Sequence, residues 1–294
     1  MTFLKSFNIS EYFFMLSPLP KSIKFFSVCI ALVIAFFVIM GILISIHAPT
    51  FAVVLFGIFV AAAIGLMVYF YRVNMNDKTA LKNKILNYFL SSRKDKHEAI
   101  LYFPIGSLKN DFLNSNIYNG YNNLFFTEQV NIGNGFKIAN TLATDRTDES
   151  RVIKFDGIFA AKKIDGFYEN EIIIKPDFEN KYVSSVVISK DKLMGNDSQK
   201  VYLENAEFEK YFEVCSKNQI KAREIVTPKY MEDLLNIKLK LGVPIKVIYK
   251  GNMKYIAIWN KKILDDKSIF RRNLDLKALK EEFDYIIEAC ENIM

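Results

Sequence analysis

Residues 245–259 read IKVIYKGNMKYIAIW, and this stretch sets the architecture expected for the C-terminal half of the chain. Two runs rich in Ile, Val and Tyr flank Gly251 and Asn252. A short glycine-containing turn between two such β-forming runs predicts a β-hairpin. We therefore expect an antiparallel sheet in this part of the chain.

Helices are predicted on both sides of the hairpin. Before it, Thr227 is an N-cap candidate, Pro228 suits the first helical position, and Gly242 with Pro244 would end the helix. After it, DLKALKEEFDYIIEACENIM (residues 275–294) predicts an amphipathic helix. Its apolar face would comprise Leu276, Leu279, Phe283, Ile286, Ile287, Cys290 and Ile293.

Further β-like runs lie upstream, bounded by Gly, Asn, Asp or Pro. They are AILYFPIG (99–106), GFKIANTLA (135–143), RVIKFDGIFAAKKI (151–164), NEIIIKP (170–176) and KVYLEN (200–205). Strands followed by helix, hairpin and helix predict an α+β domain over residues 98–294, with a mostly antiparallel sheet rather than a doubly wound one.

The N-terminal quarter is of another kind, because residues 25–71 contain no Asp, Glu, Lys or Arg. A single helix of this length would far exceed the ~30 Å hydrocarbon core of a bilayer. Pro49 interrupts the run, so we expect a transmembrane hairpin of two helices, 25–46 and 51–71, with the turn at 47–50. A hairpin buried in a soluble core is the alternative, and a signal peptide is disfavoured by the length of the run.

Basic residues flank this run on both sides, whereas its turn has none. The positive-inside rule then places both termini in the cytoplasm and the turn outside. The orienting residues are Lys21, Lys24, Arg72, Lys78, Lys82 and Lys84. We expect residues 1–24 to form an interfacial lead and 72–97 a basic juxtamembrane helix that attracts anionic lipid headgroups, with Arg93 among its basic side chains.

Small residues recur every fourth position in the second predicted span, at Gly57, Ala61 and Gly65. Such a stripe lets another helix approach closely, and we expect it to pack on the chain's own first span. Oligomerisation through the stripe is the alternative, and the sequence leaves the oligomeric state open. His47, in the turn, is interpreted as an interfacial residue rather than a titrating group.

No arrangement of residues predicts catalysis, a cofactor or a metal site. The chain has two histidines and three isolated cysteines, and it contains neither a C-x-x-C nor a P-loop pattern. Its net charge of +7 is mild and interleaved with acids, which does not favour nucleic acid as a partner. Carboxylates at Asp145, Asp148 and Asp177 leave one enzymatic alternative, in which they would line a ligand pocket.

Two segments, FDGIFAAKKIDGFYENEIIIKPDF (155–178) and residues 201–237, resemble the bacterial family known as domain of unknown function 3137. The resemblance is carried by Phe155, Gly157 and Phe159, by Phe208 and Phe212, and by the Thr227-Pro228 helix start. It departs from the family at Asp156, where we expect a basic residue, and at Asn218, where we expect Asp. The resemblance implies a short cytoplasmic lead, a membrane hairpin and an α+β domain. The family offers no established active site, so no functional residue is carried over.

We therefore expect a membrane-anchored, non-enzymatic protein. Its cytoplasmic α+β domain would bind a protein partner or lipid headgroups at the inner membrane. The alternatives are a membrane-tethered enzyme or small-ligand sensor with a carboxylate-lined pocket, and a structural subunit of a larger membrane complex.

Overall fold

The structure, a computed structural model, describes residues 49–93, 100–133, 135–146, 151–177, 199–265, 269 and 275–294. The chain divides into two compact units, Met1–Ile85 and Leu86–Met294. The predicted lead, the first predicted span and His47 lie outside the described residues. Within the part of the chain that is described, no helix combines the length and the hydropathy that a membrane span requires.

Helix α3 (Pro49–Ser91) begins at the proline that was expected to interrupt the apolar run. The predicted helices over 51–71 and 72–97 form one helix as far as Ser91. Gly57 and Gly65 face open space, because no described atom lies within 4 Å of a Cβ built at either position. The packing role of the small-residue stripe therefore stays a prediction.

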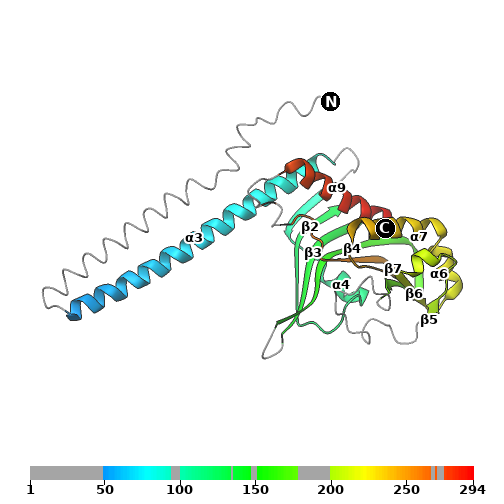
Figure 1. The fold of residues 1–294 in the computed structure, drawn as a ribbon, viewed down its shortest axis with the longest axis horizontal. Coiled ribbons are helices and arrows are strands. Elements are labelled where there is room, and N and C mark those ends of the chain that lie inside the picture. Colours follow the sequence, from blue (N-terminus) through cyan, green and yellow to red (C-terminus); the bar gives the residue numbers. More distant parts are fainter. Residues whose placement is uncertain are drawn as a thin grey trace, which may run out of the picture. The chain divides into compact units, whose positions relative to one another are not determined.

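The second unit contains an antiparallel sheet of seven strands (Figure 1). The strands are β1 (Ile100–Ile105), β2 (Asn123–Ile132), β3 (Phe136–Arg146), β4 (Arg151–Pro176), β5 (Gln199–Val201), β6 (Phe212–Ser216) and β7 (Ile245–Trp259). Every pairing between strands is antiparallel. The predicted α+β class with a mostly antiparallel sheet is confirmed.

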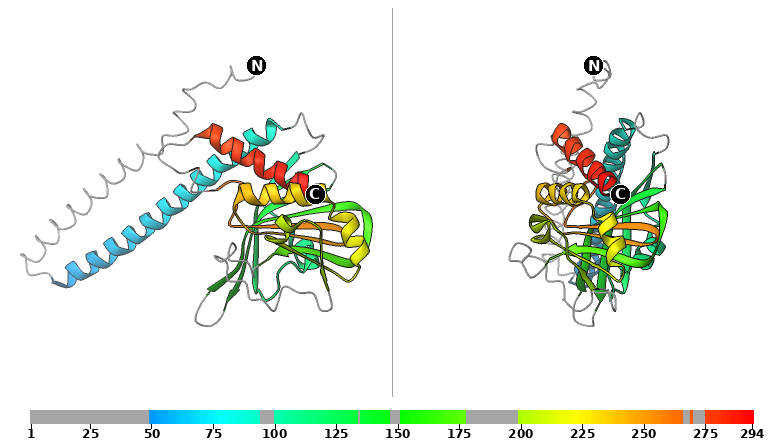
Figure 2. Two further views of the ribbon diagram at one scale, coloured as in Figure 1. Left: turned by 45° about the vertical axis from the view of Figure 1, so that its right-hand side comes forward. Right: turned by 90° about the vertical axis from the view of Figure 1, so that its right-hand side faces the viewer.

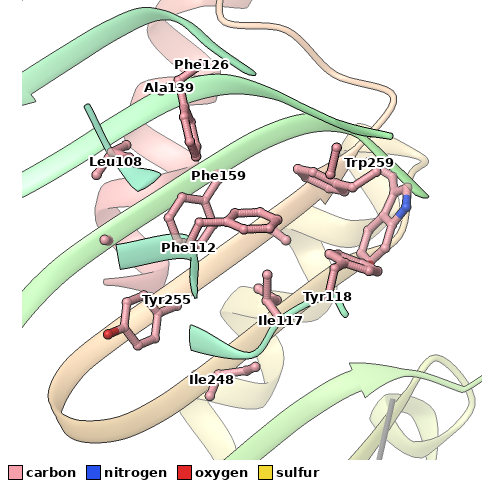
Figure 3. Packing of buried hydrophobic residues seen from close by; sticks show 14 of the residues in the cluster. Leu108, Phe112, Ile117, Tyr118, Phe126, Ala139, Phe159, Ile248, Tyr255 and Trp259 are labelled. Atoms are coloured by element: carbon pink, nitrogen blue, oxygen red, sulfur yellow. The ribbon is translucent and has the colours of Figure 1, made fainter. Parts of the chain in front are cut away.

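Strand β7 folds back on itself as the predicted hairpin. The Trp259 amide donates to the Pro244 carbonyl at 3.1 Å, although a straight strand would hold these residues roughly 50 Å apart. Gly251, midway between them, has a φ of +59°, a backbone conformation that glycine adopts without steric cost. Figure 3 shows the two arms of β7 joined by this turn.

Strand β4 bends around the tip of the β7 hairpin. Gly157 pairs with Trp259 on one arm of β7, and Ile174 pairs with Val247 on the other. The two arms of β4 therefore flank the two arms of β7, which agrees with the two separate runs predicted at 151–164 and 170–176. β3 pairs with the first arm of β4 and β6 with the second, so the β7 hairpin lies inside the sheet.

The two faces of the sheet are covered by different helices (Figures 1 and 2). Helices α7 (Pro228–Leu241) and α9 (Leu276–Ile293) pack on each other and cover one face, and α4 (Lys109–Ser115) lies on the other. Two short helices, α5 (Ala206–Glu209) and α6 (Gln219–Ile225), follow β5 and β6. β2, β6, α4, α5 and α6 were not predicted.

The predicted helix signals hold in detail. Thr227 accepts a hydrogen bond from the Tyr230 amide at 3.2 Å, and Gly242 ends α7 with a φ of +68°. The predicted apolar face of α9 is buried apart from Leu276. Both helices thus form where the capping and terminating residues agree with the apolar periodicity of the sequence.

A cluster of aromatic side chains fills the α4 face of the sheet (Figure 3). Phe112 of α4 contacts Phe159 with ring centroids 4.9 Å apart, and Tyr118 stacks on Phe155 at 5.1 Å. Gly157, between the two sheet phenylalanines, has no room for a side chain. A Cβ there would collide with the Ile258 carbonyl oxygen and approach the Trp259 Cα to 3.1 Å. The glycine of this motif is required by close strand approach rather than by a bend.

Candidate functional site

A basic and partly apolar surface is formed by β5 and α6. We call it the β5–α6 patch. Its two apolar members are unusually open to solvent: Tyr202 is 68% exposed and Ile220 72% exposed. Its basic members are all exposed, and they are Lys200, Lys217, Lys221 and Arg223.

Hydrogen bonds fix α6 against the strand, so these side chains share one surface. The Gln219 side chain donates to the Lys200 carbonyl at 3.3 Å, and Arg223 Nε donates to the Tyr202 carbonyl at 3.4 Å. Asn218 caps α6 by accepting from the Lys221 amide at 2.9 Å. Asparagine can therefore serve as the cap at the position where aspartate was expected.

The charge of the β5–α6 patch is predominantly positive. Its four basic residues stand against Glu204 and Glu224 as the exposed acids of residues 199–204 and 217–225. Glu224 pairs with Lys221 at 2.8 Å, and this hydrogen bond raises the pKa of the Lys221 ammonium. The patch thus presents a cationic rim around two exposed apolar side chains.

A row of charged residues, two of them buried lysines, crosses the first arm of β7, the second arm of β4 and β6 on the α4 face of the sheet. The register that pairs Ile174 with Val247 places Lys175 opposite Lys246, and Lys175 pairs in turn with Glu213 on β6. We call these three residues the lysine row. Lys246 is 1% exposed and Lys175 7% exposed.

Few acceptors serve the ammonium groups of this row. Lys246 Nζ donates to the Ile117 carbonyl at 3.0 Å, and Lys175 Nζ lies 3.3 Å from Glu213 Oε2. Burial, and next the charge of Lys175, lower the pKa of Lys246 to about 8. Burial raises the pKa of the nearby Cys215 thiol to about 11, so this cysteine is not an activated nucleophile.

The basic residues that the sequence singled out for topology belong to the first unit. Lys21 and Lys24 lie outside the described residues, while Arg72, Lys78, Lys82 and Lys84 lie on α3 in the unit Met1–Ile85. Lys84 is exposed and Lys82 is half-buried. Their expected role in orienting the chain stays a prediction.

Arg93 corrects one expectation about the juxtamembrane segment. It is 3% exposed, and its guanidinium forms ion pairs with Asp284 at 2.9 Å and Glu291 at 3.2 Å on α9. The sequence analysis placed it among the basic side chains that attract lipid. The carboxylates of α9 hold it inside the protein instead, because a buried guanidinium requires paired acids.

Asp145 and Asp177, the two described carboxylates of the enzymatic alternative, do not converge. Asp145 lies on β3 and pairs with Lys154 at 3.7 Å, whereas Asp177 follows the second arm of β4. The first arm of β4 and both arms of β7 lie between them, and Asp148 is outside the described residues. Among the described residues, no three His, Cys, Asp or Glu side chains gather closely enough to hold a metal ion.

The profile of a family described as protein of unknown function (DUF3137) matches residues 153–294. Over these residues the chain is similar to the DUF3137 family. The matched region contains the β5–α6 patch, the lysine row and Gly157.

Comparison with solved structures finds similarity to the crystal structure of the mycobacterial trehalose monomycolate transport factor A, TtfA. The two chains are 9% identical with a TM-score of 0.35, over 68% of this chain and 89% of that one. No curated protein matches the chain. Neither candidate feature of the DUF3137 region takes a role from these comparisons.

Sequence reasoning missed both features for different reasons. The string KNQIKAR (217–223) does signal a basic segment with an apolar residue in it, and it could have indicated the patch. Lys175 and Lys246 each stand next to a proline-bounded strand end, in IIIKP and VPIKV. Nothing local shows that these two strand ends are neighbours.

Proposed function

We propose that the chain is a membrane-anchored, non-enzymatic protein of the bacterial inner membrane, with both termini in the cytoplasm. Its α+β domain docks on anionic lipid headgroups through the β5–α6 patch. The observation that carries this proposal is the combination of two highly exposed apolar side chains with a rim of four basic ones on one surface.

Support for the anchor comes mainly from the sequence. Residues 25–71 lack acidic and basic side chains, and basic residues flank them on both sides. In the described part of this run, large apolar side chains on α3 are open to solvent, with Val54 62% exposed and Ile58 60% exposed. A run of this kind buries its apolar surface when a bilayer surrounds it.

The β5–α6 patch has the chemistry of an interfacial docking surface. Each basic residue near an anionic membrane contributes about 1 kcal/mol of attraction, and exposed Ile and Tyr side chains fit the boundary between headgroups and acyl chains. A lipid surface is favoured over a protein partner for the same patch because an anchored domain meets headgroups at a high effective concentration. Weak individual contacts are then sufficient.

A fluorescence experiment on the full chain tests this docking. The Ile220→Cys variant, labelled with an environment-sensitive dye, is placed in nanodiscs of phosphatidylcholine with or without phosphatidylglycerol. We expect a blue shift and an intensity gain only with phosphatidylglycerol, because the side chain leaves water. The matched control is Leu239→Cys on α7, a residue that is 53% exposed.

The basic residues supply the second control. Replacing Lys217, Lys221 and Arg223 with Gln should abolish the shift at position 220 while leaving the dye at position 239 unchanged. An equal response at both positions contradicts the proposal, as does a response that needs an added protein instead of anionic lipid.

A further inference from the structure

We propose that the lysine row is a binding site for an oxyanion of the phosphate or carboxylate class. This inference does not depend on docking of the β5–α6 patch. The two features lie in different environments, since the patch is exposed and the two lysines of the lysine row are buried on the α4 face of the sheet.

The sheet register is the first argument. Lys246 and Lys175 are direct cross-strand neighbours on β7 and β4, and they project toward the same face as Ile248 and Ile173 of the core cluster. Like charges in this position repel each other, and the repulsion is strong where water is excluded. A strand pair has no structural need for two lysines there, because the positions beside them are filled by apolar residues.

The charge balance is the second argument. Glu213 is the one carboxylate of the row, and Glu171 nearby is engaged by Lys250 at 2.6 Å. The Lys175 ammonium thus has the Glu213 carboxylate, whereas the described residues offer Lys246 a single carbonyl acceptor and no ion pair. An unpaired buried cation is costly, and an oxyanion would supply both the missing charge and the missing acceptors.

The ring of Tyr118, whose hydroxyl is buried, lies near Lys246. The Tyr118 ring centroid is 5.7 Å from Lys246 Nζ, and Tyr118 is 6% exposed. Its hydroxyl is buried without a hydrogen-bond partner among the described residues. Buried hydroxyls normally have a partner, so an acceptor is missing in this region. Phosphate and carboxylate oxygens accept from hydroxyl and ammonium groups alike.

Phosphate is the probe for the test, with the full chain in phosphatidylcholine nanodiscs. Thermal unfolding is followed by the fluorescence of Trp259, the one tryptophan of the chain, in phosphate and in chloride of equal ionic strength. We expect phosphate to raise the unfolding temperature. Lys246→Met should weaken phosphate binding about tenfold or more, since a charge-assisted hydrogen bond is lost.

Lys254→Met is the matched control, because Lys254 is a buried lysine of the same strand on the opposite face, 4% exposed. It should retain the response to phosphate. Glu213→Gln is the second variant, and it should bind phosphate more tightly because it removes the competing carboxylate. Because Glu213→Gln should strengthen phosphate binding, it still tests the proposal if Lys246→Met does not fold.

A further experiment distinguishes a lipid headgroup from a free anion as the source of the oxyanion. Nanodiscs with phosphatidylglycerol but without phosphate should raise the unfolding temperature in a Lys246-dependent way only if a lipid headgroup reaches the site. Without such an effect the ligand is a free anion. The proposal is overturned if neither phosphate nor phosphatidylglycerol gives stabilisation that depends on Lys246.

Discussion

Lys254 is a buried ammonium group between the sheet and the two long helices. It donates to the Ile293 carbonyl, and it lies 4.7 Å from the Tyr230 ring centroid and 4.4 Å from that of Tyr249. Burial, and next the charge of Lys162, lower its pKa from 10.5 to about 7. The aromatic faces and the end of α9 stabilise the cation only in part.

This pKa predicts a specific dependence of stability on pH. Between about pH 7 and pH 10.5 the unfolded chain binds more protons at Lys254 than the folded protein does, so the free energy of unfolding rises with pH. Lys254→Met should remove this contribution, which is on the order of a few kcal/mol. Urea unfolding at pH 7 and pH 9.5, followed by Trp259 fluorescence, measures the change.

Lys246 also contributes in this window, because its pKa is lowered to about 8. The Lys254→Met variant should therefore keep a smaller rise in stability with pH rather than none. A rise equal to that of the unsubstituted protein would show that folding does not lower the pKa of Lys254.

The role of an individual residue could be predicted where a single local rule determines its capping or its burial. The Thr227 cap and the burial of Phe155 and Phe159 follow from sequence alone, because capping and apolar burial are short-range or compositional signals. Lys246 and Lys254 were not predictable as buried residues. Their burial depends on which strands and helices cover them, and lysine in a strand more often faces solvent.

At the scale of elements, the end of the α3 segment within the second unit is held against α9. Phe89 contacts Phe283 with ring centroids 5.4 Å apart, and Arg93 forms ion pairs with Asp284, Glu288 and Glu291. The contact thus combines a buried aromatic pair with a buried guanidinium. We infer that it sets the position of α9 on residues 86–93.

Removing the guanidinium should loosen this contact. Arg93→Ala is expected to lower the free energy of unfolding by about 1–3 kcal/mol, because three carboxylates of α9 lose their ion pairs with the guanidinium. Hydrogen exchange should speed up in α9 and little in the sheet. Lys277→Ala on the same helix is the control, since its ion pair with Glu281 is exposed at 4.0 Å, and it should change stability by less than about 0.5 kcal/mol.

The comparison of Arg93→Ala with Lys277→Ala can contradict this prediction directly. If Arg93→Ala unfolds at the same urea concentration as Lys277→Ala, the buried ion pairs do not stabilise the contact between α9 and residues 86–93.

Helices and strands could be predicted where a long apolar pattern or a clear capping or turn residue marked them. The β7 hairpin, α7 and α9 each combine periodic apolar residues with Gly, Pro or a cap. Four of the five missed elements are short: α4 and α6 have seven residues each, β6 has five and α5 has four, whereas β2 has ten. Their stability comes from tertiary contacts, which local propensity does not report.

For the whole molecule, the fold class could be predicted from the sequence, whereas the topology of the sheet could not. The alternation of β-like runs and helices predicted an α+β domain correctly. The bend of β4 around the β7 hairpin was not predictable, because it depends on pairing between residues as distant as Gly157 and Trp259. The candidate sites share this limit, since the lysine row exists only through that pairing.

Membrane anchoring is the central claim of this account, and it is most directly tested by labelling from outside the cell. The variants Thr50→Cys and Lys277→Cys, which lack Cys29 and keep the buried Cys215 and Cys290, are exposed to a membrane-impermeant maleimide in intact spheroplasts. We predict labelling of position 50 at once and of position 277 only after permeabilisation. Labelling of position 277 in intact spheroplasts, or recovery of the chain in the soluble fraction, would contradict the account.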